Sequence, residues 1–475
     1  MPFRPEHSYQ DLSEQLFAPC KATPVHAPQW IAFNEELAKQ LQIPQELWAT
    51  EKGLQIFSGN QTPEWATPAA LAYAGHQFAN FVPQLGDGRA LLLTEVIANN
   101  QQRYDIQLKG SGRTPYSRGG DGRSPMGPVI REYLVSEAMH KLNVPTTRAL
   151  AAVATGEWVQ RDTAQPGAIL TRVAKSHLRV GTAQYVLHLR DYNLLKSFAD
   201  YVIDRHYPAL KDFATPYLDL LEHVQNKQAQ LIAKWMSLGF IHGVMNTDNM
   251  TLSGETIDYG PCAFMEAYDP ATKFSFIDKR GRYAYHNQPA IGLWNIARFA
   301  ETLLPLIDDD PDKAVAQATA TIETFQTTYE DYYWKEMSRK IGVNDPTIAK
   351  PLVERYLNLM QAQQVDFTQA FRFLGDATPE RAQQLFENSD SWQIWFNDWQ
   401  AHADRSDLHQ VNPAYIPRNH LIELAIQAAV NDGDLTIFNR LQRMLADPFT
   451  ERTEFKDWFE PAKSEQAITQ TFCGT

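Results

Sequence analysis

The stretch from His242 to Gly260 contains side chains that can hold a metal ion. Asn249 is followed nine residues later by Asp258, which begins the run Asp258-Tyr259-Gly260. An amide oxygen and a carboxylate that a short hairpin brings together can bind Mg2+ or Mn2+, and such ions bridge triphosphate oxygens. Either residue alone would be an ordinary turn residue. Their combination with His242 and Gly260 favours a nucleotide site with Asn249 and Asp258 as metal ligands.

A histidine loop, a hairpin and an Asp-aromatic-Gly run, in this order, are typical of kinase-like enzymes. In those enzymes an aspartate two residues after the histidine accepts the proton of the substrate hydroxyl. Here that position is Val244, which cannot accept a proton. Asp248 is the nearest carboxylate that could replace it, and a bracing role in the loop is an equal alternative from the spacing alone. The sequence therefore leaves open an inactive kinase or a different proton acceptor.

A basic, glycine-rich segment lies upstream of this loop. Residues 103–190 contain thirteen Lys or Arg and six Asp or Glu, a balance of +7 in a chain of net charge -13. Six glycines interrupt residues 109–127, which suits close approach of backbone to phosphate. A solvated basic face is the commoner explanation of a charge run, but these glycines favour a local anion site. The overall negative charge argues against a general nucleic-acid binder.

Lys109 ends an expected strand twenty-one residues after Gly88 and resembles the strand lysine with which kinases neutralise triphosphate oxygens. A glutamate on the following helix positions that lysine in kinase folds. Glu132 and Glu137 both lie on the expected helix. We choose Glu132 because it falls in the first full turn, nearest the glycine-rich segment, and a surface glutamate is the alternative for either residue.

The elements that must position these residues change along the chain from strands to helices. Alternating and β-branched patterns predict strands at 90–96, 104–109, 149–154 and 168–173, and short ones at 250–252 and 256–257. Helical spacing predicts an amphipathic helix over 129–142, a clear helix over 220–238 and helices almost throughout after residue 307. We expect a small antiparallel sheet with one inserted helix, followed by a helical half.

This pattern predicts an α+β, protein-kinase-like two-lobed fold. Its expected divisions are an N-terminal extension (1–60), a β-rich N-lobe with one helix (61–190), a C-lobe with the metal site (191–306) and a helical C-terminal extension (307–475). No apolar run approaches the roughly 18 residues that cross a bilayer, and no secretory signal is evident. We expect a cytoplasmic protein without membrane contacts.

With these residues in view, the chain resembles the selenoprotein O family of kinase-like protein adenylyltransferases over nearly its whole length. The resemblance runs through the segments 73–78, 84–89, 107–118, the His242 loop, 258–262, 412–413 and 418–420. It implies a flipped ATP whose α-phosphate faces the acceptor, so that AMP passes to a Ser, Thr or Tyr hydroxyl of a protein and pyrophosphate leaves. UTP is an alternative nucleotide, and autolabelling is expected as a possible reaction beside the labelling of protein substrates.

The resemblance also implies roles for individual residues. Asp248 becomes the proton acceptor, and Asp258 touches both nucleotide and metal. The nucleotide contacts implied by the family fall on Gly86, Gly88, Arg89, Lys109, Asp121, Gly122, Arg172, Arg179 and Asp258. A flipped triphosphate puts its terminal phosphates where a kinase holds adenine, and arginines there supply bidentate hydrogen bonds.

Cysteine usage suggests a reducing compartment, with one reservation. Cys20, Cys262 and Cys473 are too few and too scattered for a disulfide framework or a zinc cluster. The family often carries selenocysteine or cysteine near the C-terminus, a place that Cys473 matches, and in some members this residue forms a regulatory disulfide. Redox control is therefore a hypothesis.

Two other functions stay open on the sequence. An ordinary phosphotransferase would use Asp248 in place of the missing aspartate, and an inactive pseudokinase would act as a nucleotide-gated binding module. Transfer of the γ-phosphate would identify the first of these. A biological role that survives the loss of Asp248 would identify the second.

Overall fold

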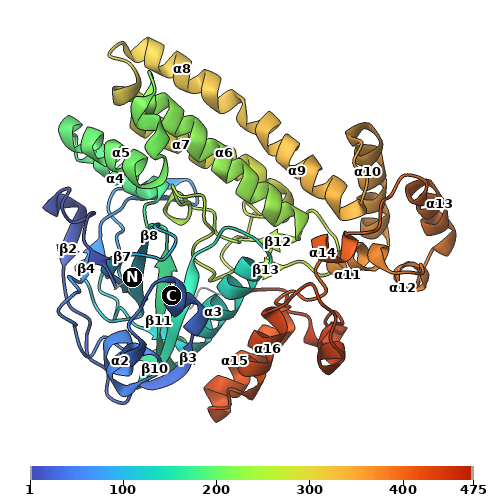
Figure 1. The fold of residues 1–475 in the computed structure, drawn as a ribbon, viewed down its shortest axis with the longest axis horizontal. Helices are drawn as coiled ribbons and strands as arrows, with labels where there is room; N and C mark the ends of the chain where they lie inside the picture. The colour runs from blue at the N-terminus through green and yellow to red at the C-terminus, as the bar shows by residue number, and fades with distance from the viewer. Residues whose placement is uncertain (1–2, 472–475) are drawn as a thin grey trace.

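The computed structural model describes residues 3–471 and shows a mixed α+β protein with an antiparallel sheet in its first part and helices in the rest (Figure 1). The strands are β1 (Pro5–Glu6), β2 (Phe17–Pro19), β3 (Gln29–Phe33), β4 (Ala69–Leu71), β5 (Gly75–Gln77), β6 (Asn80–Val82), β7 (Ala90–Ile97), β8 (Arg103–Lys109), β9 (Ser124–Pro125), β10 (Arg148–Gln160), β11 (Ala164–Ala174), β12 (Phe240–Ile241) and β13 (Ala263–Phe264). The longer strands confirm those predicted within 90–109 and 149–173.

The α-helices include short ones in the N-terminal part and long ones in the C-terminal part. They are α1 (Glu35–Gln40), α2 (Glu51–Phe57), α3 (Met126–Lys141), α4 (Val180–His188), α5 (Tyr192–His206), α6 (Pro216–Ser237), α7 (Gln288–Ile307), α8 (Pro311–Glu323), α9 (Phe325–Ile341), α10 (Pro346–Ala362), α11 (Phe367–Arg372), α12 (Glu380–Gln384), α13 (Ser389–Gln400), α14 (Leu408–Val411), α15 (Asn419–Asp432) and α16 (Thr436–Leu445). The helices predicted at 220–238 and after residue 307 are confirmed.

Among the described residues, nine strands form one sheet with the order β2-β4-β7-β8-β11-β10-β3, in which β1 also pairs with β7 and β9 with β11. The first forty residues supply β2 and β3 at its two ends. Side chains of α1 and α2 form a hydrophobic cluster with one face of the sheet, through residues such as Leu37, Phe57 and Ile106. The N-terminal segment therefore completes the sheet as well as packing on it.

The register of β8 and β11 brings polar side chains together on the face that α3 covers. Lys109 pairs with Leu170, and Gln107 pairs with Arg172. Directly paired residues project to the same side of a sheet, and residues two apart share a face. Lys109, Gln107 and Arg172 therefore lie on one face, toward Glu132 of α3.

Helix α3 differs from the amphipathic helix predicted over 129–142. It begins at Met126, and its charged residues Arg131 and Glu132 are as buried as its apolar ones. One side of α3 lies on β10 and β11, while α15 and α16 cover the other (Figure 1). The sequence of α3 alone does not predict that its second side is buried, because the helices that bury it lie about three hundred positions later in the chain.

The strands predicted at 250–252 and 256–257 do not form. Thr251 and Thr256 instead make isolated bridges to Arg179 and Thr146. The Thr251 side chain closes the turn by donating to the Glu255 carbonyl (2.7 Å) and accepting from the Glu255 N–H (2.9 Å). Side-chain hydrogen bonds therefore replace a strand ladder, and the two arms of this hairpin tie the sheet-bearing part to the helical part.

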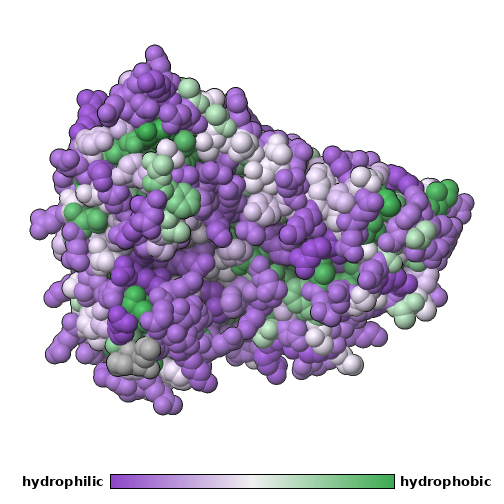
Figure 2. Space-filling view, turned by 45° about the horizontal axis from the view of Figure 1, so that its top comes forward, coloured by the Kyte–Doolittle hydropathy of each residue, from purple (hydrophilic) through white to green (hydrophobic). Residues whose placement is uncertain are grey.

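The helices α8 and α9 follow one another in a line across the molecule, beside α6 and α7 (Figure 1). The segment Tyr285–Ile307, which contains α7, is long and apolar enough by length and composition to cross a membrane, so the expectation that no such segment exists is wrong. In the structure α7 packs against α4, α6 and α8, and it buries polar residues such as Asn295. This packing accounts for its apolar composition. Hydrophilic residues cover most of the face shown in Figure 2.

Candidate nucleotide and metal site

One cavity of about 750 Å³ gathers the predicted site residues. Its lining includes Gly86, Gly88, Arg89, Lys109, Asp121, Gly122, Arg172, Arg179, Asp248, Asn249 and Asp258. These residues come from the sheet, the glycine-rich segment and the loop after α6, which are far apart in the sequence. The structure thus brings all of the predicted residues together, and their individual roles stay predictions.

Lys109 lies at the centre of a buried charge network. Its Nζ atom is 2.6 Å from both Glu132 Oε2 and Asp258 Oδ1. Glu137 instead accepts hydrogen bonds from Arg148, at 2.8 and 2.7 Å. The choice of Glu132 over Glu137 as the partner of Lys109 is therefore confirmed.

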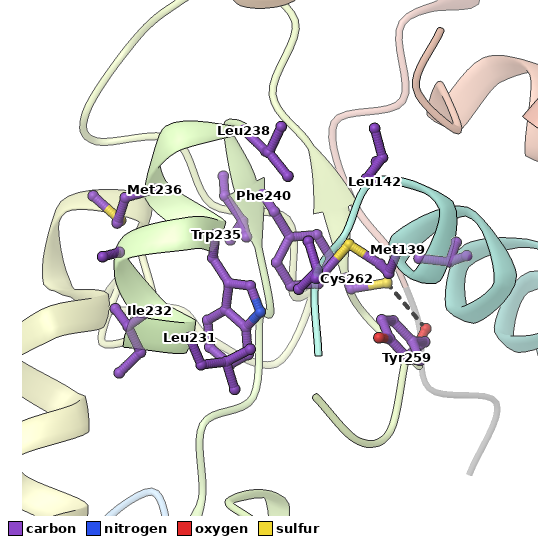
Figure 3. Packing of buried hydrophobic residues seen from close by; sticks show 14 of the residues in the cluster. Met139, Leu142, Leu231, Ile232, Trp235, Met236, Leu238, Phe240, Tyr259 and Cys262 are labelled. Carbon is purple, nitrogen blue, oxygen red and sulfur yellow. Dashed lines mark hydrogen bonds between the residues drawn. The ribbon is translucent and has the colours of Figure 1, made fainter. Parts of the chain in front are cut away.

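Asp258 is fixed at the base of the cavity by its neighbours in the core. Its φ of 68° is a left-handed conformation, which aspartate tolerates better than most residues. Figure 3 shows Tyr259 and Cys262 packed beside Met139 of α3 and Phe240 of β12, with the Cys262 thiol donating to the Tyr259 carbonyl (3.3 Å). The carboxylate that precedes this anchored turn has little freedom to move.

Charge and burial act in opposite directions on Asp258. Burial raises the pKa of its carboxyl, but Lys109, Arg172 and Arg89 lower this pKa by more than burial raises it. The resulting pKa lies well below the ordinary value for aspartate. Asp258 is therefore ionised at neutral pH. An ionised, held carboxylate is the state that a divalent cation requires.

Asp248 and Asn249 lie on a single 3-10 turn over Thr247–Asn249. Burial raises the pKa of the Asp248 carboxyl to about 6, against the lowering effect of Arg179. Within residues 3–471 no hydrogen-bond donor reaches its buried Oδ1, and Oδ2 is 3.5 Å from Gln77 Nε2. A Cβ at Gly75 would come within 2.6 Å of Oδ1, so only glycine leaves room there.

Val244 stands at the position where kinases have aspartate, and its backbone carbonyl orients the side chain of Asn249. The Asn249 amide nitrogen donates to the Val244 carbonyl at 3.0 Å. This hydrogen bond commits the NH2 group and leaves the amide oxygen of Asn249 as the remaining ligand atom.

The two predicted arginines, Arg172 and Arg179, are both buried, and protein groups bind their guanidinium nitrogens. Arg172 donates from Nε and Nη2 to Gln107 Oε1 (3.2 and 2.7 Å) and from Nη1 to Glu132 Oε1 (3.1 Å). Arg179 donates from Nη1 to the Asp248 carbonyl (3.1 Å), and its Cζ lies 4.4 Å from the centre of the Tyr73 ring. These contacts fix both guanidinium groups before any ligand binds.

Asp87 joins the two arginines, and the sequence reasoning missed it. Its Oδ1 is 3.6 Å from Arg179 Nη2, and its Oδ2 accepts from Gln107 Nε2 (3.0 Å), the residue that also holds Arg172. Asp87 is buried. The position of Asp87 between Gly86 and Gly88 could have indicated a role in the site. Aspartate is so common in turns, however, that this position alone does not distinguish it.

The glycine-rich segment forms the wall around Gly86 and Gly122. A Cβ at Gly86 would lie 2.3 Å from the Tyr116 ring, and one at Gly122 would lie 2.0 Å from the Gly112 carbonyl. Asp121 is exposed and pairs with Arg161 (2.8 and 3.1 Å), a cavity residue that the sequence reasoning did not single out. The glycines are therefore needed for close packing of this wall.

The side-chain oxygens of Asn249 and Asp258 are of the type that suits a divalent metal ion. Among residues 3–471, no group of three or more His, Cys, Asp or Glu is placed to bind a metal by itself. An amide oxygen and a carboxylate are the hard ligands that Mg2+ takes when substrate phosphates and water complete its shell.

Cys473 lies outside the described residues, so the predicted redox control remains a hypothesis.

Comparison with known proteins identifies the family. The family described as protein adenylyltransferase SelO matches residues 3–446. A protein nucleotidyltransferase YdiU of Rhizobium etli is 51% identical over 485 residues, covering 99% of this chain and 97% of the relative. One of the same name from Maridesulfovibrio salexigens is 48% identical over 490 residues, covering 100% and 98%. The chain therefore belongs to the SelO family of protein adenylyltransferases.

Proposed function

We propose that the protein transfers AMP from ATP to Ser, Thr or Tyr hydroxyls of cytoplasmic proteins, with UTP as the alternative nucleotide and autolabelling as a side reaction. The sheet-bearing part and the helices that follow it correspond, in this proposal, to the two lobes of a kinase-like fold. One observation carries the proposal: Val244 stands where a kinase needs aspartate, and the same cavity holds a buried Asp248. Its Oδ1 has no hydrogen-bond partner among the described residues 3–471.

The proposed step uses Asp248 as the base. The acceptor oxygen forms a bond to the α-phosphorus as the bond from that phosphorus to the β-bridging oxygen breaks. Pyrophosphate leaves with the bonding electron pair, and the hydroxyl proton passes to the Asp248 carboxylate. Burial supports this role, because a carboxyl with a pKa of about 6 is ionised at neutral pH yet more basic than an exposed aspartate.

A flipped nucleotide explains why buried arginines line the cavity. Arg172 and Arg179 are pre-positioned cations, and a terminal phosphate pair is the part of ATP that needs them. Lys109 and Arg89 add positive charge near Asp258. Mg2+ or Mn2+ on Asn249 and Asp258 would neutralise charge that develops on the phosphates.

Two labelled forms of ATP test the proposal. With a divalent cation and a mixture of candidate acceptor proteins, α-labelled ATP should label protein and γ-labelled ATP should not. Intact mass should show the addition of a nucleotidyl group. Labelling from the γ position alone would instead establish a phosphotransferase.

Three alanine variants test the roles within the site. Asp258→Ala and Lys109→Ala should reduce turnover more than Asp248→Ala, because charge neutralisation and positioning supply most of the rate in phosphate transfer. Wild-type rates in both Asp258→Ala and Lys109→Ala would contradict the site assignment.

A further inference from the structure

A second cavity of about 620 Å³ adjoins the nucleotide cavity. It is lined by Phe78, Ile277, Asp278, Lys279, Arg280, Gly281, Arg282, Asn287, Ala290 and Ile291. We call it the basic groove. Phe78 and Ile277 also line the nucleotide cavity, so the two spaces share a wall.

The shared wall is tied to the loop that carries Asp248. Asn246 Oδ1 accepts hydrogen bonds from the Phe78 N–H (3.0 Å) and the Tyr283 hydroxyl (2.6 Å). The rings of Phe78 and Tyr283 are 5.1 Å apart. A chain lying in the groove would therefore pass within a few residues of the proposed base.

The groove carries three cations without acidic partners. No ion pair to Lys279, Arg280 or Arg282 occurs within residues 3–471. Lys279 lies 3.9 Å from the centre of the Phe276 ring, and Arg282 lies 5.0 Å from that of Trp294, so aromatic faces hold them in place. These charges stand out in a chain whose net charge is -13.

The acidic side chain of the groove lining, Asp278, is occupied by backbone hydrogen bonds. Asp278 is buried, and its two oxygens accept from the backbone N–H groups of Arg282 (2.9 Å) and Tyr283 (2.7 Å). Lys273 Nζ donates to the carbonyls of Asp278 and Lys279. The loop is thus held by its own polar groups, while Lys279 and Arg280 are exposed.

Large apolar side chains are exposed beside these cations. Phe276 is 42% exposed and Ile277 is 56% exposed. They are not on a loose segment, because the Phe276 N–H donates to the Thr471 carbonyl (3.2 Å) and Ser275 bridges to Thr471. Exposed apolar groups on a held loop next to unpaired cations are typical of a surface that binds a partner.

We propose that the basic groove binds the acceptor protein through an extended segment with acidic side chains around the modified hydroxyl and an apolar side chain against Phe276 and Ile277. This inference rests on the proposed function, which requires a protein hydroxyl to reach Asp248. The three cations select an acidic partner by charge complementarity. The shared wall delivers the neighbouring hydroxyl to the nucleotide cavity.

Matched synthetic peptides test the groove with the full chain. Each has a central tyrosine and one leucine, flanked by glutamates, by glutamines or by lysines. AMP transfer from α-labelled ATP should show a kcat/KM about tenfold higher for the glutamate peptide than for the glutamine peptide, and lowest for the lysine peptide. Equal values for the three peptides would overturn the proposal.

Charge reversal in the groove should reverse this preference. The double variant Lys279→Glu/Arg280→Glu should lose about tenfold in kcat/KM on the glutamate peptide and gain on the lysine peptide, mainly through KM. The neutral pair Lys279→Gln/Arg280→Gln should give a partial effect and serves if the first variant does not fold. Lys227→Glu/Lys335→Glu, an equal charge change at exposed sites on α6 and α9, should leave the preference unchanged.

Failure of the groove and failure of the proposed function give different results. If adenylylation itself is wrong, no peptide or protein takes up α-label with any variant. If only the groove is wrong, label is taken up without regard to flanking charge. Fluorescence anisotropy of the same peptides reports binding without chemistry. Tighter, Lys279-dependent binding of a single-stranded oligonucleotide or of anionic vesicles would replace the acidic segment by a phosphate-bearing partner and overturn the proposal.

Discussion

The Asp87 carboxylate contacts Arg179 and, through Gln107, Arg172, the two arginines that we expect to bind phosphate. Asp87→Asn keeps the size but removes the charge. Its NH2 group would face either Arg179 or the donors that Asp87 Oδ2 now accepts from, the Gln107 amide (3.0 Å) and the Leu71 N–H (3.3 Å). A buried charged hydrogen-bond partner contributes about 1–3 kcal/mol. We expect KM for ATP to rise by about tenfold or more, measured by steady-state AMP transfer.

A control separates this positioning role from a loss of folding. Asp376→Asn also removes a charge that is paired with an arginine, Arg381, but lies in the helical part (2.7 Å). Its KM for ATP should match the wild type. If Asp87→Asn also leaves KM unchanged while both proteins stay folded, the arginines do not depend on Asp87.

Residues near the chemistry were the easiest to predict from the sequence. Asn249 and Asp258 were chosen from coordination chemistry, and both line one cavity with the predicted nucleotide contacts and Asp248. Asp87 could not be found in this way, because its importance lies in a contact with Arg179 across ninety-two positions. Arg161 was hidden for the same reason, since its partner Asp121 is forty positions away.

At the scale of elements, local patterns located strands and helices but not what covers them. The pattern over 129–142 indicated a helix with one apolar face, whereas α15 and α16 bury its other face as well. The short strands predicted at 250–252 and 256–257 failed because Thr251 offers its hydroxyl to the backbone of its own turn. A short stretch of sequence does not show which distant helices will pack on it. Nor does it show whether a side chain will take the hydrogen bonds that a strand would use.

The junction of α9 and α11 buries a lysine, and this makes stability depend on pH. Lys340 is buried with its Nζ 4.5 Å from the centre of the Phe371 ring, and burial lowers its pKa to about 7. Between about pH 7 and 10 the unfolded chain binds more protons at this site than the folded one, so its contribution to stability rises with pH. Lys340→Met removes the cost of burying the amine.

We therefore expect Lys340→Met to raise the melting temperature by a few degrees near pH 7, with the gain shrinking toward pH 10. Differential scanning fluorimetry across this range measures it. Lys335→Met, at an exposed site on the same helix, should show no such pH trend. A gain for Lys340→Met that stays constant with pH would mean that packing, not titration, sets the effect.

At the scale of the molecule, the C-terminal helices support the site through α3. The Phe438 ring of α16 lies 5.6 Å from that of Tyr133, one residue after Glu132. Phe438→Ala should cost about 3–5 kcal/mol of unfolding free energy and raise KM for ATP, because α3 carries the partner of Lys109. Denaturant unfolding and AMP transfer well below the transition measure the two effects.

Trp392→Ala is the matched control for this long-range effect. Trp392 is fully buried, and its ring stacks on Phe396 within α13, at 4.6 Å. The variant should lose comparable stability while keeping its KM for ATP. Equal changes of KM in both variants would show that general destabilisation, and not the cover over α3, reaches the site.

The charge distribution of the whole molecule should direct the nucleotide to its cavity. ATP is an anion approaching a chain of net charge -13, whereas the segment 103–190, which supplies much of the cavity lining, carries +7. Arg118 is exposed, lines the cavity and has no ion pair within residues 3–471. Arg118→Glu should raise KM for ATP several-fold at low salt, and the difference should shrink as salt screens charges beyond a Debye length of about 10 Å. Arg443→Glu, exposed on α16, changes the net charge equally, so an equal salt-dependent rise there would show that net charge alone governs ATP entry.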